Sequence, residues 1–540
     1  MLEERELFSV TTLRWLYNDE QQRAVRYVPF NVQAFVNVGL QAAGATKCTS
    51  LEKLQDGALN RVFLLTFDND VELIAKIPYP CAGPRHFCTA SEVATLDFLR
   101  TELGFPVPHV RAWSSRAEQT AVGAEFIMYE KIPGIQLRCL DDASVPLPDD
   151  PHYQVLAPIQ RMESRLSKSF FSQIGSIYYK EDVPEALRAR SLYSSTVQSS
   201  TNSERFRIGP TVNREFWRAG RAHLDIDRGP WPDVRSWLLA LAACARASAD
   251  VHPDTAFREE YYRLISDYEK LVPYLAPRRV PFILWHPDFH ARNIIVTAEK
   301  PHQLSGIIDW QSAVVAPDYM QLCIPPAYTS EDHPLVQWSD EDGPTLSPEV
   351  SALSDDQKRL AHLAYRQAER RMLHELLMRQ RDPALAEQLH GNPDVDVKRL
   401  ASSPAVAITR GNAEGLGFVG RSLLDCRLLW AHVVGVDSSG QPRVPFPIQF
   451  SEADEARIEA EWSTLLHEES ICDELFERLG IEPGSEGAVR ADEYEKAKQA
   501  AEEAMQAALD AAPTQEERER VAEAWPLQDG KLSLNAESCY

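Results

Sequence analysis

The chain from Trp285 to Val296 reads WHPDFHARNIIV. A short apolar run at residues 306–308 follows, and Asp309-Trp310 comes directly after it. The order is therefore His-x-Asp-x-x-x-x-Asn, a strand, a turn, a second strand and an aspartate. Two strands joined in this way form a hairpin. A hairpin places a residue just before its first strand close to a residue just after its second strand.

These residue types match the needs of phosphoryl transfer. That reaction requires a carboxylate near the acceptor hydroxyl and oxygen ligands for Mg²⁺ at the nucleotide phosphates. We expect Asp288 to orient or deprotonate the hydroxyl. We expect Asn293 and Asp309 to hold the metal, because hard cations prefer oxygen ligands.

Two other interpretations of this segment are available. Asp288 and Asn293 could merely shape a polar turn. His286, Asp288 and His290 also alternate like the ligands of a metal hydrolase. Against a hydrolase, no HExxH motif or Cys/His cluster completes a tetrahedral zinc site, and a neutral asparagine suits Mg²⁺ with a nucleotide better than zinc.

The upstream segment predicts a compact α+β lobe. Periodicity and turn residues give the element order β-β-β-α-β-β between residues 47 and 134. The named elements are strands at Val62–Phe67 and Val71–Ile77, a helix at Ser91–Leu103, and strands at Val110–Trp113 and Phe126–Tyr129.

Lys76 lies in an otherwise apolar strand, Leu73–Ile77. A buried lysine needs an anionic partner, and Glu92 in the following helix can provide it. We predict a partly buried ion pair that leaves the ammonium able to contact nucleotide phosphates. The alternative is a lysine at a strand edge in solvent.

A loop between two strands, residues 55–63, could cover the nucleotide. It contains a single glycine, Gly57, followed by Asn60. Its backbone N–H groups could meet a phosphate, although a plain hairpin turn explains this stretch about equally well. The chain has no Walker A motif, which argues against a P-loop fold.

Composition restricts the class of protein. Of 540 residues, 44% are hydrophobic and 25% are charged, as in ordinary globular proteins. The net charge is −24, and residues 451–540 alone carry 24 acidic and 8 basic side chains. This acidity argues against nucleic acid as a partner, and the lack of an 18-residue apolar run argues against a membrane span. The nine scattered cysteines suit reduced thiols.

The residues quoted above resemble the aminoglycoside phosphotransferase and choline-kinase-like family, which has the protein-kinase-like fold. The resemblance covers roughly residues 47–328. Shorter motifs resemble a fungal group of the altered-inheritance-of-mitochondria type. They are Leu7-Phe8-Ser9, Arg14 to Asn18, Phe171 to Tyr178, and Ile308 to Gln311.

The family resemblance implies an α+β, bilobal fold with a small β-rich N-lobe and a large, mainly helical C-lobe. It makes Asp288 the catalytic residue and implies ATP and Mg²⁺ as cofactors. The implied metal ligands are Asn293 and Asp309, and the implied nucleotide-binding residues are Gly57, Asn60, Lys76, Glu92, Glu130 and Ile132. Glu130 and Ile132 enter as hinge residues whose backbone would bond the adenine.

The expected organisation has four parts. They are a helical extension at residues 1–44, the N-lobe at 45–134, the C-lobe at 135–485 with the catalytic and metal-binding segment at 282–311, and an acidic helical tail at 486–540. The tail reads as a solvated appendage, since its alanine and glutamate content suits an exposed helix.

Three functions compete. The favoured one is transfer of the γ-phosphate of ATP to a hydroxyl of a small-molecule acceptor. The glycine-poor loop and the long additions at both ends of the chain favour a pseudokinase or scaffold. A protein kinase is disfavoured because no Ala-Pro-Glu segment follows Asp309. The acidic start lacks the features of a presequence, which predicts a cytoplasmic protein; the narrower resemblance implies mitochondria instead.

Overall fold

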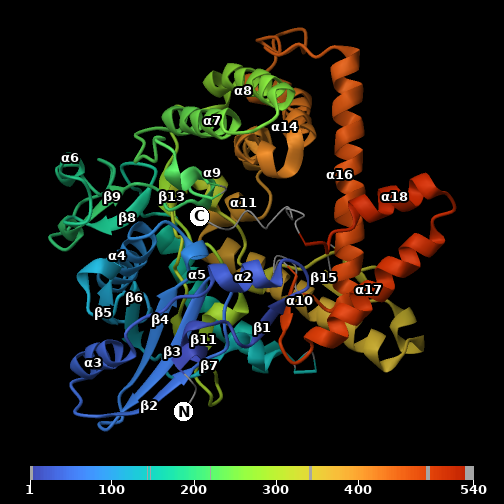
Figure 1. The fold of residues 1–540 in the computed structure, drawn as a ribbon. Coiled ribbons are helices and arrows are strands. Elements are labelled where there is room, and N and C mark those ends of the chain that lie inside the picture. The colour runs from blue at the N-terminus through green and yellow to red at the C-terminus, as the bar shows by residue number, and fades with distance from the viewer. Residues whose placement is uncertain are drawn as a thin grey trace.

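The computed structural model describes residues 4–142, 144–145, 147–218, 220–339, 343–481 and 487–529. A small lobe built on a five-stranded sheet sits beside a larger, mainly helical lobe (Figure 1). This arrangement confirms the predicted α+β, two-lobed fold. The predicted tail boundary at residues 485/486 lies outside the described residues.

The sheet of the small lobe is antiparallel, with strand order β2-β3-β4-β6-β5. Its elements are β2 (Cys48–Lys53), β3 (Asn60–Phe67), β4 (Glu72–Pro78), α4 (Phe87–Thr101), β5 (Val110–Ser114) and β6 (Phe126–Glu130). The order β-β-β-α-β-β matches the prediction from the sequence.

The side chains of strand β4 point alternately to the two faces of the sheet. Side chains alternate along a strand, so Leu73, Ala75 and Ile77 enter one apolar core, which they share with Phe35 of α3 (Val32–Ala43). Lys76 lies on the other face, where α4 packs. The alternation places a charged side chain between the sheet and α4.

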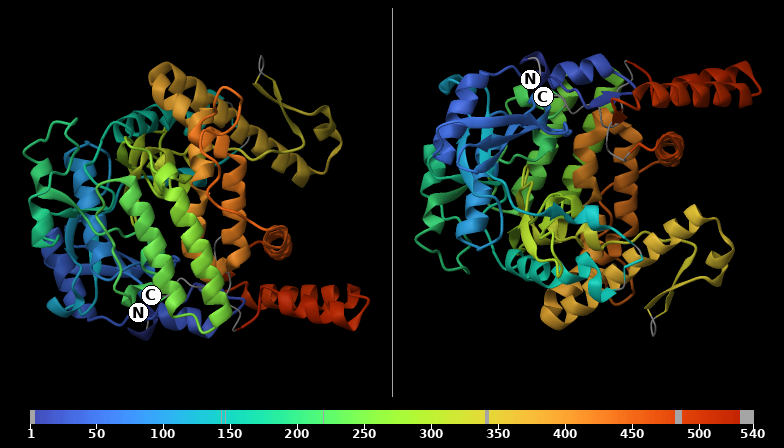
Figure 2. Two further views of the ribbon diagram at one scale, coloured as in Figure 1. Left: turned by 90° about the horizontal axis from the view of Figure 1, so that it is seen from above. Right: turned by 90° about the horizontal axis from the view of Figure 1, so that it is seen from below.

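The two ends of the chain meet beside the small lobe. The N-terminal part contains α1 (Glu4–Phe8), β1 (Leu13–Trp15) and α2 (Asp19–Val25), and the C-terminal part contains β16 (Ala488–Arg490), α17 (Tyr494–Ala511) and α18 (Gln515–Ala524). Strands β1 and β16 form an antiparallel pair. Figure 2 shows the red C-terminal helices extending from the body while their start lies against the blue N-terminal segment. The expected helical tail thus begins with a strand, β16, which the sequence did not predict and which pairs with the N-terminal segment.

The large lobe is a helical assembly around one apolar core. Its helices are α5 (Pro151–Leu166), α6 (Glu185–Arg188), α7 (Val234–Asp250), α8 (Thr255–Leu275), α9 (Asp318–Gln321), α10 (Asp355–Arg381), α11 (Pro383–Leu389), α12 (Pro393–Ala401), α13 (Ser403–Ala407), α14 (Gly411–Leu428), α15 (Trp430–Val434) and α16 (Glu452–Leu479). A capping box of Ser354 and Gln357 starts α10.

Short antiparallel strand pairs interrupt the helices. They are β8 (Ser176–Tyr179) with β9 (Phe206–Gly209), β10 (Phe282–Leu284) with β13 (Val315–Pro317), β11 (Ile294–Val296) with β12 (Leu304–Ile307), to which β7 (Ile135–Gln136) is added, and β14 (Val336–Ser339) with β15 (Gly343–Leu346). The β11–β12 hairpin is the one predicted to bring the metal ligands together. Within the described residues no helix is long and apolar enough to cross a membrane.

Candidate active site

Lys76 and Glu92 form the predicted buried ion pair. The ammonium of Lys76 lies 2.8 and 2.9 Å from the two carboxylate oxygens of Glu92, and both residues are 4% exposed. It also lies 3.5 Å from Oδ1 of Asp309. Burial by itself lowers the pKa of Lys76, but the carboxylates of Glu92 and Asp309 outweigh it, so the pKa is raised and the lysine stays charged.

His286 ties the catalytic loop to the segment that precedes Asp309. Its Nδ1 accepts a hydrogen bond from the amide of Asp288 at 3.0 Å, and its Nε2 donates to the carbonyl of Ile308 at 3.0 Å. Burial lowers the pKa of His286 to about 4, which keeps the ring neutral, as this bonding requires. Both ring nitrogens are engaged in hydrogen bonds, so His286 is not available as a metal ligand. This argues against a metal hydrolase with His286, Asp288 and His290 as its ligands.

Asp288 lies in this loop with its side chain about one-third exposed. Its Oδ2 accepts hydrogen bonds from Arg292 at 3.0 Å and from the side-chain amide of Asn293 at 3.2 Å. Nε2 of His290 lies 3.2 Å from Oδ1. The carboxylate is thus held in one orientation by neighbours two to five residues along the chain. Sequence reasoning did not identify Arg292 or His290 as partners, although their spacing from Asp288 was visible.

The β11–β12 hairpin places Asn293 beside the segment that leads to Asp309. Ile294 pairs with Ile307, and the amide of Ile308 donates to the carbonyl of Asn293 at 3.0 Å. Asp309 follows with φ of +64°, a left-handed conformation that aspartate tolerates better than most residues. Such backbone strain is common at functional sites.

The donor set fits a nucleotide-bound Mg²⁺. The side-chain nitrogen of Asn293 donates to the carbonyl of Asp288 at 2.8 Å, which leaves its oxygen as the free end of the amide. Asp309 contributes a carboxylate that is 45% exposed. Mg²⁺ is usually held by one or two such groups together with substrate phosphates. The described residues contain no cluster of three or more His, Cys, Asp or Glu that could hold a metal without phosphates.

The loop at residues 55–60 connects β2 to β3 and reaches the same site. The side-chain nitrogen of Asn60 donates to Oε1 of Gln311 at 2.6 Å, two residues after Asp309. The amide of Gly57 donates to the carbonyl of Asn60 at 3.3 Å. The loop therefore folds back on itself and contacts the segment of the metal candidates.

The hinge begins at Glu130, the last residue of β6, and connects the two lobes. The amide of Glu130 donates to the carbonyl of His109 at 3.0 Å, so this donor is already used. The side chain of Ile132 packs on Gly306 of β12, where an added Cβ would lie 2.3 Å from Cδ1 of Ile132. Gly306 thus allows the hinge to lie directly on the catalytic hairpin.

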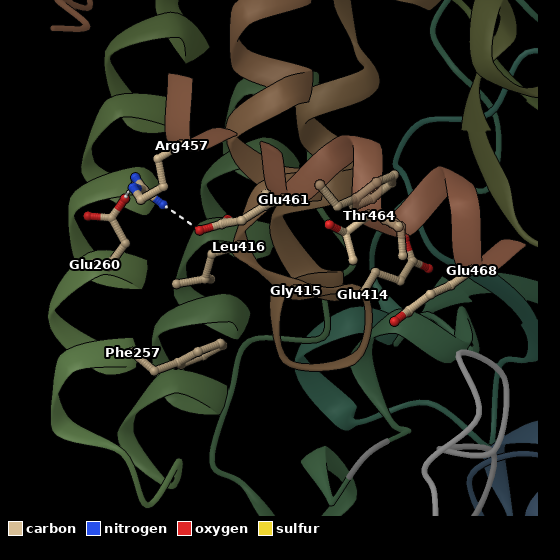
Figure 3. A pocket seen from close by; sticks show the side chains of 12 residues that line it. Phe257, Glu260, Glu414, Gly415, Leu416, Arg457, Glu461, Thr464 and Glu468 are labelled. Atoms are coloured by element: carbon tan, nitrogen blue, oxygen red, sulfur yellow. Dashed lines mark hydrogen bonds and ion pairs between the residues drawn. The ribbon is translucent and has the colours of Figure 1, made fainter. Parts of the chain in front are cut away.

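A separate pocket of about 420 Å³ lies between α8, α14 and α16 (Figure 3). Its charged lining includes Arg457, which is paired with Glu260 and with Glu461 at 2.5 and 3.1 Å. None of the residues predicted from the sequence to act in catalysis or binding lines this pocket.

Comparison with known proteins supports the motifs. A model of the phosphotransferase enzyme family matches residues 208–320, which include Asp288, Asn293 and Asp309. A subtelomeric hrmA-associated cluster protein of Aspergillus fumigatus is 27% identical over 508 residues, covering 83% of this chain and 91% of the relative. Altered inheritance of mitochondria protein 9, mitochondrial, from Komagataella phaffii is 24% identical over 440 residues, covering 76% and 68%. The resemblance stated from the sequence is confirmed.

Solved structures are similar at lower identity. The GDP complex of a mutant aminoglycoside 2′-phosphotransferase-IIIa is 12% identical, covers 76% of this chain and 100% of that chain, and has a TM-score of 0.34. A macrolide 2′-phosphotransferase from Brachybacterium faecium is 15% identical, covers 76% and 100%, and has a TM-score of 0.30.

Proposed function

Because residues 208–320 match the phosphotransferase enzyme family, we propose that the protein transfers the γ-phosphate of ATP to a hydroxyl of a small-molecule acceptor. The observation that carries the proposal is the placement of Lys76. Its ammonium lies against Glu92 of α4 on one side and Asp309 on the other. A buried cation between these carboxylates fits a group that also contacts nucleotide phosphates.

The proposed roles follow from the contacts. Lys76, aligned by Glu92, contacts the α- and β-phosphates, and Asn293 and Asp309 hold the metal–nucleotide complex. Mg²⁺ supplies positive charge that offsets the phosphates. Asp288 accepts the proton of the acceptor hydroxyl, and its hydrogen bonds with Arg292 and Asn293 keep its carboxylate oriented.

The remaining nucleotide contacts come from the small lobe. The loop with Gly57 and Asn60 covers the phosphates, and the backbone carbonyl of Glu130 and the backbone of Ile132 bond the adenine. The backbone N–H and C=O of Ile132 have no hydrogen-bond partner elsewhere in the described chain, which leaves them available to a purine edge.

A pseudokinase is the second candidate. Both oxygens of the Asp288 carboxylate are engaged, by Arg292 on one side and His290 on the other. Asn60 is engaged by Gln311. These contacts favour a site that binds nucleotide without turning it over.

Thermal shift with ATP, with and without Mg²⁺, tests the nucleotide site. We expect the parent to be stabilised by ATP and further stabilised when Mg²⁺ is added, because ligands that bind only the folded state raise its stability. Asp309→Asn should remove the Mg²⁺-dependent part, while Asp396→Asn, on the exposed surface of α12, should not. Mg²⁺ dependence that persists in Asp309→Asn would contradict the metal assignment.

For location, we propose the mitochondrion over the cytoplasm. The support is the name of the relatives from Komagataella phaffii and Yarrowia lipolytica, which calls them mitochondrial. Fractionation of cells that express the natural gene tests this, and recovery with cytoplasmic markers alone would contradict it.

A further inference from the structure

The loop at residues 55–60 is anchored from outside through Asp56, which is 4% exposed. Its Oδ2 accepts hydrogen bonds from the amides of Thr11 and Thr12 at 2.8 and 3.1 Å. The same oxygen accepts from Oγ1 of Thr12 at 3.0 Å and from Lys53 at 3.0 Å. Oδ1 accepts from the hydroxyl of Tyr79 at 3.2 Å. One buried carboxylate thus joins the loop to the N-terminal segment, to β2 and to the residue after β4.

Other contacts hold the backbone of the same loop. The amide of Asp56 donates to Oγ1 of Thr12 at 2.9 Å. The carbonyl of Ala58 accepts from Nε of Arg26 at 3.1 Å, and the carbonyl of Leu59 accepts from the amide of Tyr79 at 2.9 Å. Three of the loop's six residues therefore have their backbone fixed by groups outside the loop.

The N-terminal segment that supplies these contacts is itself held by the C-terminal tail. The amide of Leu16 donates to the carbonyl of Gly487 at 3.1 Å, and the amide of Ala491 donates to the carbonyl of Thr12 at 2.9 Å. Between these bonds Arg14 lies opposite Val489. Hydrogen-bonded pairs alternate along antiparallel strands, so Arg14 and Val489 also exchange backbone hydrogen bonds.

Two side-chain contacts strengthen this junction. The guanidinium of Arg14 lies 3.9 Å from the ring centre of Tyr494, the first residue of α17. The backbone amide of Asn18 donates to Oδ1 of the Asp529 side chain at 2.5 Å. The tail therefore contacts the N-terminal segment through β16, through the first residue of α17 and through Asp529, the last described residue.

We propose that Asp56 is a positioning residue for the nucleotide, and that both ends of the chain act through it as a brace on the nucleotide loop. Glycine-rich loops shape themselves around phosphates through conformational freedom. This loop has one glycine, and the hydrogen bonds between Thr12 and Asp56 hold it in shape. The tail in turn holds Thr12 through the bond from Ala491 beside β16. The inference rests on the proposed function and predicts that nucleotide affinity depends on residues far from the site, including the tail.

The test uses the full chain with matched variants. Thr12→Val removes the hydroxyl that bonds both the amide and the carboxylate of Asp56, while Thr12→Ser keeps it. Val489→Pro removes a donor from the centre of β16, while Gln499→Pro breaks α17 on its exposed face and leaves β16 unchanged. Dissociation constants for ATP·Mg²⁺ and amide exchange at residues 57–60 are measured for all four and for the parent.

We expect Thr12→Val and Val489→Pro to weaken ATP·Mg²⁺ binding by about 2- to 10-fold, the effect of losing a hydrogen bond or two, and to speed exchange at residues 57–60. Thr12→Ser and Gln499→Pro should stay close to the parent. In any turnover assay the loss should fall on the KM for ATP with kcat little changed.

The outcomes separate this inference from the proposed function. If the parent binds no nucleotide, the proposed function is wrong and the positioning role falls with it. If the parent binds ATP·Mg²⁺ and Thr12→Val and Val489→Pro bind it equally well, the brace alone is overturned. Faster loop exchange with unchanged affinity also overturns the positioning role, because the brace would then be structural only.

Discussion

Replacing Glu92 by glutamine should destabilise the fold by about 3–5 kcal/mol, the usual cost of removing one partner of a buried ion pair. The change leaves the ammonium of Lys76 buried, with Asp309 at 3.5 Å as its remaining carboxylate. Asp309 is nearly half exposed, so water weakens its attraction. It therefore replaces only part of what Glu92 provides.

The same reasoning predicts a coupling between the two residues. Lys76→Met leaves the carboxylate of Glu92 buried without its cation, which also costs several kcal/mol. In the double variant Lys76→Met/Glu92→Gln no charge is left in the pair, so the total cost should be clearly smaller than the sum of the single costs.

Urea denaturation at neutral pH, followed by tryptophan fluorescence and by far-UV circular dichroism, measures these costs. The matched control is Glu72→Gln on β4, the strand that carries Lys76. Glu72 pairs with Lys131 at 2.7 Å, and both side chains are roughly two-fifths exposed. An exposed pair contributes about 0–1 kcal/mol. Equal losses in Glu92→Gln and Glu72→Gln, or additive losses in the double variant, would refute the buried pair as a coupled unit.

Two further predictions concern the catalytic loop and the hinge. The pKa of His286 is about 4, below the unperturbed value of about 6.5. Between these pH values the unfolded chain binds a proton that the folded chain does not, so the free energy of unfolding should fall by up to about 1.4 kcal/mol per pH unit as pH decreases. His286→Gln should flatten this slope, and an identical slope in both proteins would count against the neutral, buried ring. Gly306→Ala should displace Ile132 and lower nucleotide affinity. Adding Ile132→Ala to the same chain should restore part of the lost affinity. Unchanged affinity in Gly306→Ala would show that this packing does not fix the hinge.

The parts of the site that follow local patterns were predictable from the sequence. An apolar strand with one lysine, followed by a helix with a glutamate, led to the Lys76–Glu92 pair. The spacing of Asn293 and Asp309 around two short strands led to the hairpin. In both cases period-2 alternation and turn residues determine which side chains meet.

The contacts missed from the sequence join distant segments. Thr12 bonds Asp56 across 44 residues of sequence, beside the pairing of β1 with β16, and Asn60 bonds Gln311 across the two lobes. No local periodicity encodes such pairings. Asp56 itself looked like an ordinary turn residue, because aspartate before glycine is common in turns; only its burial and five hydrogen bonds distinguish it.

Phosphate transfer by Asp288→Asn beside the parent tests the central claim most directly. The variant keeps the size of the side chain and removes the base, and Asp396→Asn on α12 serves as the control. ADP release is followed with ATP·Mg²⁺ and a panel of small hydroxyl compounds. We expect the parent and the control to transfer phosphate to at least one compound, and Asp288→Asn to bind ATP·Mg²⁺ normally but transfer about 10²–10⁴-fold more slowly. Transfer at the parental rate by Asp288→Asn, or ATP binding without transfer to any compound by the parent, would contradict the account.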